Sequence, residues 1–301
     1  MGNISSYPSG FRGGAAIKNV PLFDSIAGNV FWVDSGTGGA GNPGSFTRPV
    51  ATIAQGLALC TDSNGDYVMV FPGHAETVTA AIAFNKIGVS VVGVGRGNLR
   101  PTITGNGAID AVDVSAANMT LANVIFAAPL TDAQTADVNV NAAGFSLLST
   151  KHLGSVATEN KVSFVTITAD GDDCLIDGMR GHNEVVDMVS GVEIAACDGL
   201  EMRNCIITSA STLGYSTGVI DDTGIATNLW IHDCLFKNIK AATAVMTFAS
   251  NSVGIVSDCA VSGRHTTIAS NILTGTGVDF FETYVTEQVT VSGLLIPTID
   301  S

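Results

Sequence analysis

A short pattern recurs along the chain at nearly regular intervals, and it constrains the fold more than any other feature of the sequence. Each copy runs turn residue, apolar, variable, apolar, variable, then a polar residue or glycine, then a small or apolar residue. The copies are Gly88–Val94, Asn118–Val124, Asp173–Met179, Gly199–Cys205 and Asn228–Cys234, with a looser sixth that ends at Ile255–Cys259.

The second apolar position of each copy serves as a marker for the length of the repeat. The markers are Val91, Leu121, Ile176, Met202, Ile231 and Val256, so they are separated by 30, 55, 26, 29 and 25 residues, and 55 is about two periods. A unit of this length with several short strands is typical of one coil of a parallel β-helix, which buries its inward side chains only by stacking on its neighbours. The sequence therefore predicts an all-β solenoid.

The cysteines fit the same repeat. Cys205, Cys234 and Cys259 occupy one phase of successive coils, and the chain has no C-x-x-C pair among its six cysteines. In a long chain with few cysteines we expect free buried thiols, and these three should form an interior ladder at the ~4.8 Å strand spacing. A metal or redox column is the alternative, but we expect no metal and no cofactor.

Composition and charge exclude several classes of protein. Charged residues make up 13% of the 301 residues, against a usual ~25%, and the net charge is −14. Such a field repels phosphate backbones and anionic lipid, so we expect no nucleic-acid partner and no membrane partner. No apolar run approaches the length of a membrane span, and the first residues do not resemble a signal peptide. We expect a soluble protein that is not exported by an ordinary signal.

The chain divides into three parts. Residues 1–29 have scattered single hydrophobes without a period, which predicts an extended docking arm, with a disordered terminus as the alternative. Residues 30–270 form the predicted β-helix, with a short amphipathic helix near 51–60 whose buried face is Ile53, Leu57 and Cys60 and whose N-cap is Thr47 or Ser45. Residues 271–301 are expected to form a C-terminal β tail that covers the last coil or pairs with a neighbouring chain.

The repeat, together with Gly44–Leu57 and Gly65–Gly73, resembles the right-handed parallel β-helix proteins of the pectin-lyase-like superfamily. The resemblance covers about residues 30–270. It implies a right-handed solenoid with a short N-terminal helix over the open end of the coil stack. A solenoid needs such a cap because its first coil otherwise exposes an apolar interior and an unpaired strand edge. Fold alone does not imply an activity.

A second resemblance concerns the first eleven residues. Met1–Phe11, continuing into a β-helix, looks like virion structural proteins of tailed bacteriophages. It implies a non-enzymatic capsid decoration or cement protein, expected to be a homotrimer. Such a protein is made in the bacterial cytoplasm and is located on the capsid surface. The arm would dock on the major capsid protein or other virion proteins through Tyr7, Phe11, Arg12 and Lys18.

The alternative is a tailspike-type polysaccharide depolymerase or lyase, or a glycan-binding adhesin. An enzyme needs grouped acid and base side chains, and the best candidates are Asp170, Asp172, Asp173, Arg180 and His182. Because the aspartates lie in a Gly-rich turn, where Asp often binds its own backbone, we expect no catalytic residue and favour a protein that is not an enzyme.

One further run resembles a pectate-lyase strand motif. Asn228–Asp233 ends in His232-Asp233, whereas the motif ends in Asp-His. Because the coil repeat already accounts for these positions, we assign them to packing and turn formation. The chain has only two Trp and four Tyr to stack on sugars.

Overall fold

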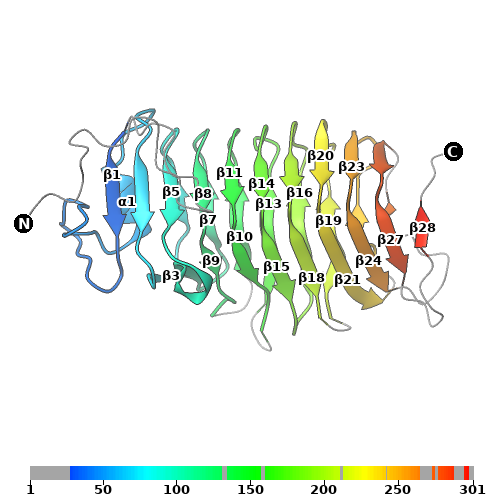
Figure 1. The fold of residues 1–301 in the computed structure, drawn as a ribbon, viewed down its shortest axis with the longest axis horizontal. Coiled ribbons are helices and arrows are strands. Elements are labelled where there is room, and N and C mark those ends of the chain that lie inside the picture. Colours follow the sequence, from blue (N-terminus) through cyan, green and yellow to red (C-terminus); the bar gives the residue numbers. More distant parts are fainter. Residues whose placement is uncertain are drawn as a thin grey trace, which may run out of the picture.

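The repeated segments form one wall of a parallel β-helix, as predicted (Figure 1). The computed structural model describes residues 28–130, 134–156, 160–210, 213–241, 243–264, 273–274, 277–287 and 295–297. Within them, each full coil contributes one strand to each of three sheets, and coils follow one another along the long axis from the N-terminal to the C-terminal end. The predicted arm, residues 1–29, lies almost wholly outside the described residues.

The first sheet contains the repeat and orders its ten described strands along the molecule. They are β1 (Val30–Val33), β2 (Tyr67–Val70), β5 (Ser90–Gly93), β8 (Thr120–Ala122), β11 (Ser146–Leu148), β14 (Leu175–Asp177), β17 (Glu201–Arg203), β20 (Leu229–His232), β23 (Gly254–Ser257) and β26 (Val278–Phe281).

The second sheet follows the first within each coil. Its strands are β3 (Ala75–Val78), β6 (Thr102–Gly105), β9 (Ile125–Phe126), β12 (Lys151–Leu153), β15 (Arg180–Asn183), β18 (Ile206–Ser209), β21 (Leu235–Ala241), β24 (Ala260–Arg264), β27 (Tyr284–Glu287) and β28 (Leu295–Pro297). Strand β28 pairs with β27 in the antiparallel direction, whereas the other pairs of this sheet are parallel. A short 3-10 turn, Gly97–Leu99, precedes β6.

The third sheet completes each coil. Its strands are β4 (Ile82–Phe84), β7 (Asp110–Val114), β10 (Gln134–Val140), β13 (Lys161–Ile167), β16 (Met188–Ile194), β19 (Tyr215–Asp222), β22 (Met246–Thr247) and β25 (Leu273–Thr274).

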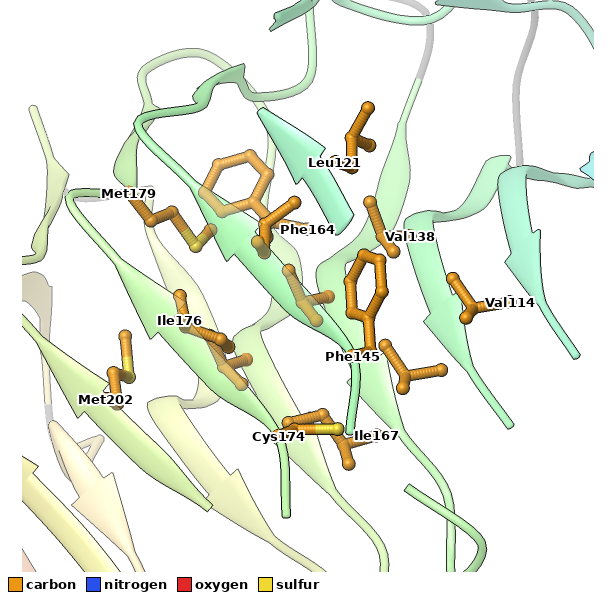
Figure 2. Close-up of a cluster of buried hydrophobic side chains, with 14 of the residues drawn as sticks. Val114, Leu121, Val138, Phe145, Phe164, Ile167, Cys174, Ile176, Met179 and Met202 are labelled. Carbon is orange, nitrogen blue, oxygen red and sulfur yellow. The ribbon is translucent and has the colours of Figure 1, made fainter. Parts of the chain in front are cut away.

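The marker residues stack in register inside the β-helix. Val91 pairs with Leu121. Farther along the sheet, Ile176 pairs with Met202, Met202 with Ile231, and Ile231 with Val256. Leu147 lies between Leu121 and Ile176 and is the missing copy within the spacing of 55 residues. These side chains are buried, and in Figure 2 Leu121, Ile176 and Met202 face residues of the third sheet such as Val138 and Ile167. The predicted repeat is confirmed as the inward column of the first sheet.

Left-handed backbone at both ends of these strands explains the turn residues of the pattern. Before the strand, positive φ angles occur at Gly65, Gly88, Asn118, Gly144, Asp173, Gly199 and Asn228. After it, they occur at Asn123, Ser149, Gly178, Asn204, Asp233, Asp258 and Glu282. Gly, Asn and Asp tolerate this conformation best, so the pattern marks two corners of each coil.

The three cysteines lie at equivalent positions of successive coils. Each is buried, and the Sγ atoms of Cys205, Cys234 and Cys259 each donate to the carbonyl oxygen two residues earlier, at 3.0–3.1 Å. Each sulfur also contacts a carbonyl oxygen of the preceding coil at 3.7–3.8 Å, and Cys234 Sγ accepts from the Cys205 N–H at 3.4 Å. Thr283 continues the column, because its hydroxyl makes the same two contacts, to Phe281 and Val256.

The predicted helix is present as α1 (Ile53–Leu59), at the N-terminal end of the coil stack (Figure 1). Its residues Ile53 and Leu57 belong to the core, with Cys60 at the C-cap. The predicted N-cap was wrong: Thr52, not Thr47 or Ser45, accepts from the Gln55 N–H at 3.2 Å. The helix starts later than expected because the segment before it makes β-bridges at Ser45, Arg48 and Val50.

Candidate functional site

The structure keeps the three predicted aspartates together in the turn between β13 and β14. Asp170 and Asp173 are exposed, and the Asp172 carboxylate accepts from the Asp198 N–H at 2.8 Å. The Asp173 N–H donates to the Asp198 carbonyl at 2.7 Å. Asp172 therefore links its turn to the equivalent turn of the next coil.

Arg180 and His182 lie elsewhere. Both are exposed on β15 of the second sheet, beyond the far end of β14. The His182 Nδ1 atom is 2.8 Å from the Thr208 hydroxyl on β18. One strand of the first sheet thus separates these two side chains from the aspartates, and the five residues do not form one cluster. The predicted docking residues Tyr7, Phe11, Arg12 and Lys18 lie outside the described residues.

A different group of polar and aromatic side chains gathers on the outer face of the first sheet. We call it the Trp230 cluster, and it consists of Asp177 on β14, Glu201 and Arg203 on β17, and Trp230 and His232 on β20. Strand register brings these residues together, since Asp177, Arg203 and His232 are neighbours in one column and Glu201 and Trp230 in another.

Ion pairs connect the polar members of the cluster. Arg203 donates from Nε to Asp177 at 3.0 Å and from a terminal nitrogen to Glu201 at 2.6 Å. The hydrogen bond to Asp177, supported by the one to Glu201, raises the pKa of Arg203. The His232 ring lies 3.4 Å from Glu201 through Nε2 and 2.8 Å from Asp233 through Nδ1. These contacts fix the rotamers of the cluster's polar side chains, which are 13–35% exposed, and they leave carboxylate oxygens open to solvent.

Trp230 is the aromatic member of the cluster. Its residue surface is 48% exposed, although an indole of this size is usually largely covered in a folded protein. The indole stacks on the His232 ring, with ring centroids 4.2 Å apart and an interplanar angle of 24°. Because His232 is held from two sides, the indole has a fixed support and offers one flat face to solvent.

A shallow groove of about 450 Å³ runs beside the cluster, at the corner between the first and second sheets. It is lined by Arg180, Asn204, Cys205, Ile206, Asp233, Cys234, Leu235, Asp258, Cys259, Ala260 and Tyr284. Asp233 joins the two regions, since its carboxylate contacts His232. Tyr284, 61% exposed, and Leu235, 39% exposed, provide apolar surface along the groove.

Sequence reasoning missed this site because it assigned Asn228–Asp233 to packing and turn formation. That assignment holds for Ile231, which is buried, and for Asp233, which has a positive φ angle. It is wrong for Trp230, whose side chain points away from the core. The sequence did contain a signal for this. Successive side chains of a strand point to opposite faces of the sheet, so the residues on either side of an inward marker must face outward.

Two further observations concern the described residues. Their His, Cys, Asp and Glu side chains include no group of three or more placed to hold a metal ion. None of the described helices has the length and apolar character needed to cross a membrane.

Comparison with known proteins shows similarity at the level of fold. No protein-family model matches the chain, and no curated protein sequence matches it. The structure of pectate lyase Pel9A is similar, with a TM-score of 0.50 and 13% identity over 84% of this chain and 78% of that chain. A rhamnogalacturonan lyase has a TM-score of 0.46, 13% identity and coverage of 84% and 73%.

A GH136 lacto-N-biosidase from Eubacterium ramulus aligns with a TM-score of 0.37 and 10% identity, over 87% of this chain and 67% of that chain. At identities this low, similarity shows the fold and not the activity. Together with the strand order, the match to pectate lyase Pel9A shows that this chain folds as a pectin-lyase-like parallel β-helix.

Proposed function

We propose that this protein binds a polysaccharide on the outer face of its first sheet, with Trp230 as the platform for a sugar ring. The exposed indole, stacked on His232, carries the proposal. An aromatic face contributes dispersion and CH–π contact with the apolar face of a sugar, and an indole that is already immobilised loses little conformational entropy on binding.

The charges beside Trp230 favour one class of glycan. Asp177, Glu201 and Asp233 supply three carboxylates against the single guanidinium of Arg203. Carboxylate oxygens accept hydrogen bonds from sugar hydroxyl groups, whereas the same charges, in a chain of net charge −14, repel a polyuronate. The preferred ligand is therefore an uncharged polysaccharide, and the adjacent groove extends the surface along which such a chain lies.

The test is binding of soluble neutral polysaccharides and of polygalacturonate, measured by affinity electrophoresis and calorimetry. We expect binding to a neutral glycan and at least about tenfold weaker binding by Trp230→Ala, because loss of an aromatic platform costs ~1.5 kcal/mol. Leu99→Ala, which removes an exposed apolar side chain elsewhere, is the matched control. A wild-type protein that binds none of the glycans, or a Trp230→Ala variant that binds as well, contradicts the proposal.

A second experiment tests whether the bound glycan is cleaved. Glu201 is the carboxylate closest in register to the platform, since it pairs with Trp230. In a depolymerase, new reducing ends accumulate with the wild-type protein and not with Glu201→Gln. In an adhesin, both proteins bind and neither cleaves.

The second candidate is the virion structural protein implied by the Met1–Phe11 resemblance, favoured by a low charged fraction and a regular solenoid body. This role includes trimer formation and docking of the arm through Tyr7, Phe11, Arg12 and Lys18. Light scattering of the purified protein and its co-sedimentation with phage capsids test it. A monomer that does not sediment with capsids contradicts this candidate.

A further inference from the structure

A cluster of ionisable side chains lies buried between the second and third sheets and takes no part in the proposed binding surface. It consists of Asp137 on β10, His152 on β12 and Lys161 on β13. Each of the three is at most 1% exposed. Burying charged groups costs free energy even when they are paired, so this arrangement calls for a role beyond packing.

The Lys161 amine is positioned against the Asp137 carboxyl group. Its Nζ atom lies 2.6 Å from Asp137 Oδ1 and donates to the carbonyl oxygens of Ala127, at 3.2 Å, and Leu153, at 2.9 Å. These three acceptors match the three N–H groups of an ammonium, and when the proton that faces Asp137 passes to its carboxyl group, the neutral amine keeps its two carbonyl acceptors and its lone pair lies on the side of Asp137. Burial lowers the pKa of Lys161 and so favours this neutral form.

The two oxygens of Asp137 have different partners. Oδ1 faces Lys161 and accepts from the Gln134 amide at 3.0 Å, whereas Oδ2 lies 2.9 Å from His152 Nδ1. The carbonyl oxygen of Gln134 has no hydrogen-bond partner within the described part of the chain, so Gln134 keeps its amide on Asp137 at the cost of an unpaired acceptor. Oδ1 is thus surrounded by N–H donors, and Oδ2 lies beside a proton carrier.

His152 is held for proton transfer. Its Nε2 atom is 2.9 Å from the Thr150 hydroxyl, and its ring stacks on Phe126 with centroids 4.8 Å apart. Burial lowers the pKa of His152, so the ring is neutral and has one nitrogen that donates and one that accepts. Phe164, whose ring centroid is 5.7 Å from the Lys161 nitrogen, helps to exclude water.

We propose that Lys161 and Asp137 form an intramolecular isopeptide bond in the folded chain. The Lys161 nitrogen bonds to Asp137 Cγ while Gln134 stabilises the charge that develops on Oδ1. One ammonium proton moves to the carboxyl group before the bond forms, and a second leaves the nitrogen afterwards. His152 passes both protons to Oδ2, the bond between Cγ and Oδ2 breaks, and that oxygen leaves as water, while the third proton stays on the amide nitrogen. Counted from the ion pair, an ammonium and a carboxylate become one amide and one water molecule, so atoms and charge balance without an oxidant or a co-reactant.

The bond would connect β10 to β13 covalently and so tie one coil to the next. The remaining N–H of the amide keeps one of the two backbone carbonyls, at Ala127 or Leu153, as its acceptor. The apolar surroundings favour the reaction because a buried, hydrogen-bonded amide costs less free energy than a buried pair of charges.

The test is the mass of the full-length protein after complete denaturation, followed by peptide mapping. We expect the intact mass to be lower by one water, and a proteolytic fragment in which the peptide containing Asp137 is joined to the one containing Lys161. Lys151, which lies on β12 and is only half-buried, is the internal control and should be recovered with a free amine.

Two variants address the mechanism. Lys161→Gln should abolish the mass loss, and His152→Gln should fold to the same circular dichroism spectrum but form the cross-link at least about tenfold more slowly, as expected when a general acid–base group is removed. A wild-type protein of full sequence mass, with Lys161 recovered as a free amine, overturns the proposal. A mass loss that persists in Lys161→Gln overturns it as well.

Discussion

At the residue scale, the corner positions show why this chain uses Gly, Asn and Asp where it does. Asn123 has a positive φ angle and donates from its side-chain amide to the carbonyls of Gly93, at 2.8 Å, and Gly95, at 3.1 Å. One residue thus adopts a conformation that most residues avoid and satisfies two backbone acceptors of the preceding coil. Glycine at an equivalent corner, such as Gly178, provides the conformation without the side-chain bonds.

The outer face of the third sheet places two acidic residues next to each other. Glu193 on β16 pairs in register with Asp221 on β19. Partial burial, and then repulsion by Asp221, raises the pKa of Glu193 above its ordinary value of 4.5. A carboxyl group whose pKa is higher in the folded state costs no stability at a pH below 4.5, and its cost appears as the pH rises through the folded-state value.

We therefore expect Glu193→Gln to stabilise the protein at pH 7 by less than about 1 kcal/mol, because charge pairs near the surface contribute about that much. The gain should disappear near pH 4, and thermal unfolding at both pH values measures it. Glu201→Gln is the control of opposite sign, since Glu201 pairs with Arg203. A Glu193→Gln variant that is less stable at pH 7 contradicts the argument.

At the element scale, helix α1 closes the N-terminal end because its buried face fits the first coils. Thr52 caps the helix, and Glu76 on β3 accepts from the Ile53 N–H at 3.0 Å. Glu76 is itself held by His74, whose Nε2 atom lies 3.1 Å away and whose Nδ1 atom accepts from the Ser35 N–H. Glu76 on β3 and His74, the residue just before that strand, therefore position the cap.

Gly56 brings the helix close to the sheet. A Cβ atom at this position would lie 2.8 Å from methyl groups of both Val33 and Val68. Gly56→Ala gains ~1 kcal/mol of helix propensity but overpacks the contact at a cost of ~1–3 kcal/mol, so we expect net destabilisation. Chemical denaturation measures the sign, with Ala58→Gly on the exposed face as a propensity control. A more stable Gly56→Ala protein means that the helix does not pack as closely as described.

At the scale of the whole molecule, a stack of coils is vulnerable at its ends, where unpaired strand edges invite pairing with another chain. Helix α1 lies over the N-terminal coils, and β28 pairs antiparallel with β27 through Val285–Ile296 and its neighbours. Residues 295–297 thus cover the edge of the second sheet within their own chain, whereas β26 and β27, which lie in the segment expected to form a tail, continue the parallel sheets.

Removal of residues 295–301 should expose the edge of β27. We expect concentration-dependent self-association in sedimentation velocity, because an open edge pairs with a second copy. A protein that lacks only residues 298–301 keeps β28 and is the matched control. Equal sedimentation of the two shortened proteins at every concentration contradicts a protective role for β28.

The length and the corners of the coil can be predicted from the sequence alone. Inward residues such as Leu121, Ile176 and Met202 recur once per coil because each coil buries them only against its neighbours, and Gly, Asn or Asp recurs at the corners because left-handed backbone requires it. Both constraints act on local sequence, so both leave a periodic trace. The spacing of apolar residues also predicts the position of α1. It does not predict the N-cap, because the β-bridges before the helix decide where the helix begins.

Which polar residues come into contact is visible only in the folded chain. Asp177, Arg203 and His232 become neighbours because the first sheet keeps its register while loops elsewhere in the coil vary in length. Asp137, His152 and Lys161 meet inside the β-helix although charged residues are ordinarily exposed. Contact between residues of different coils depends on this register, and a single sequence carries no periodic signal for it.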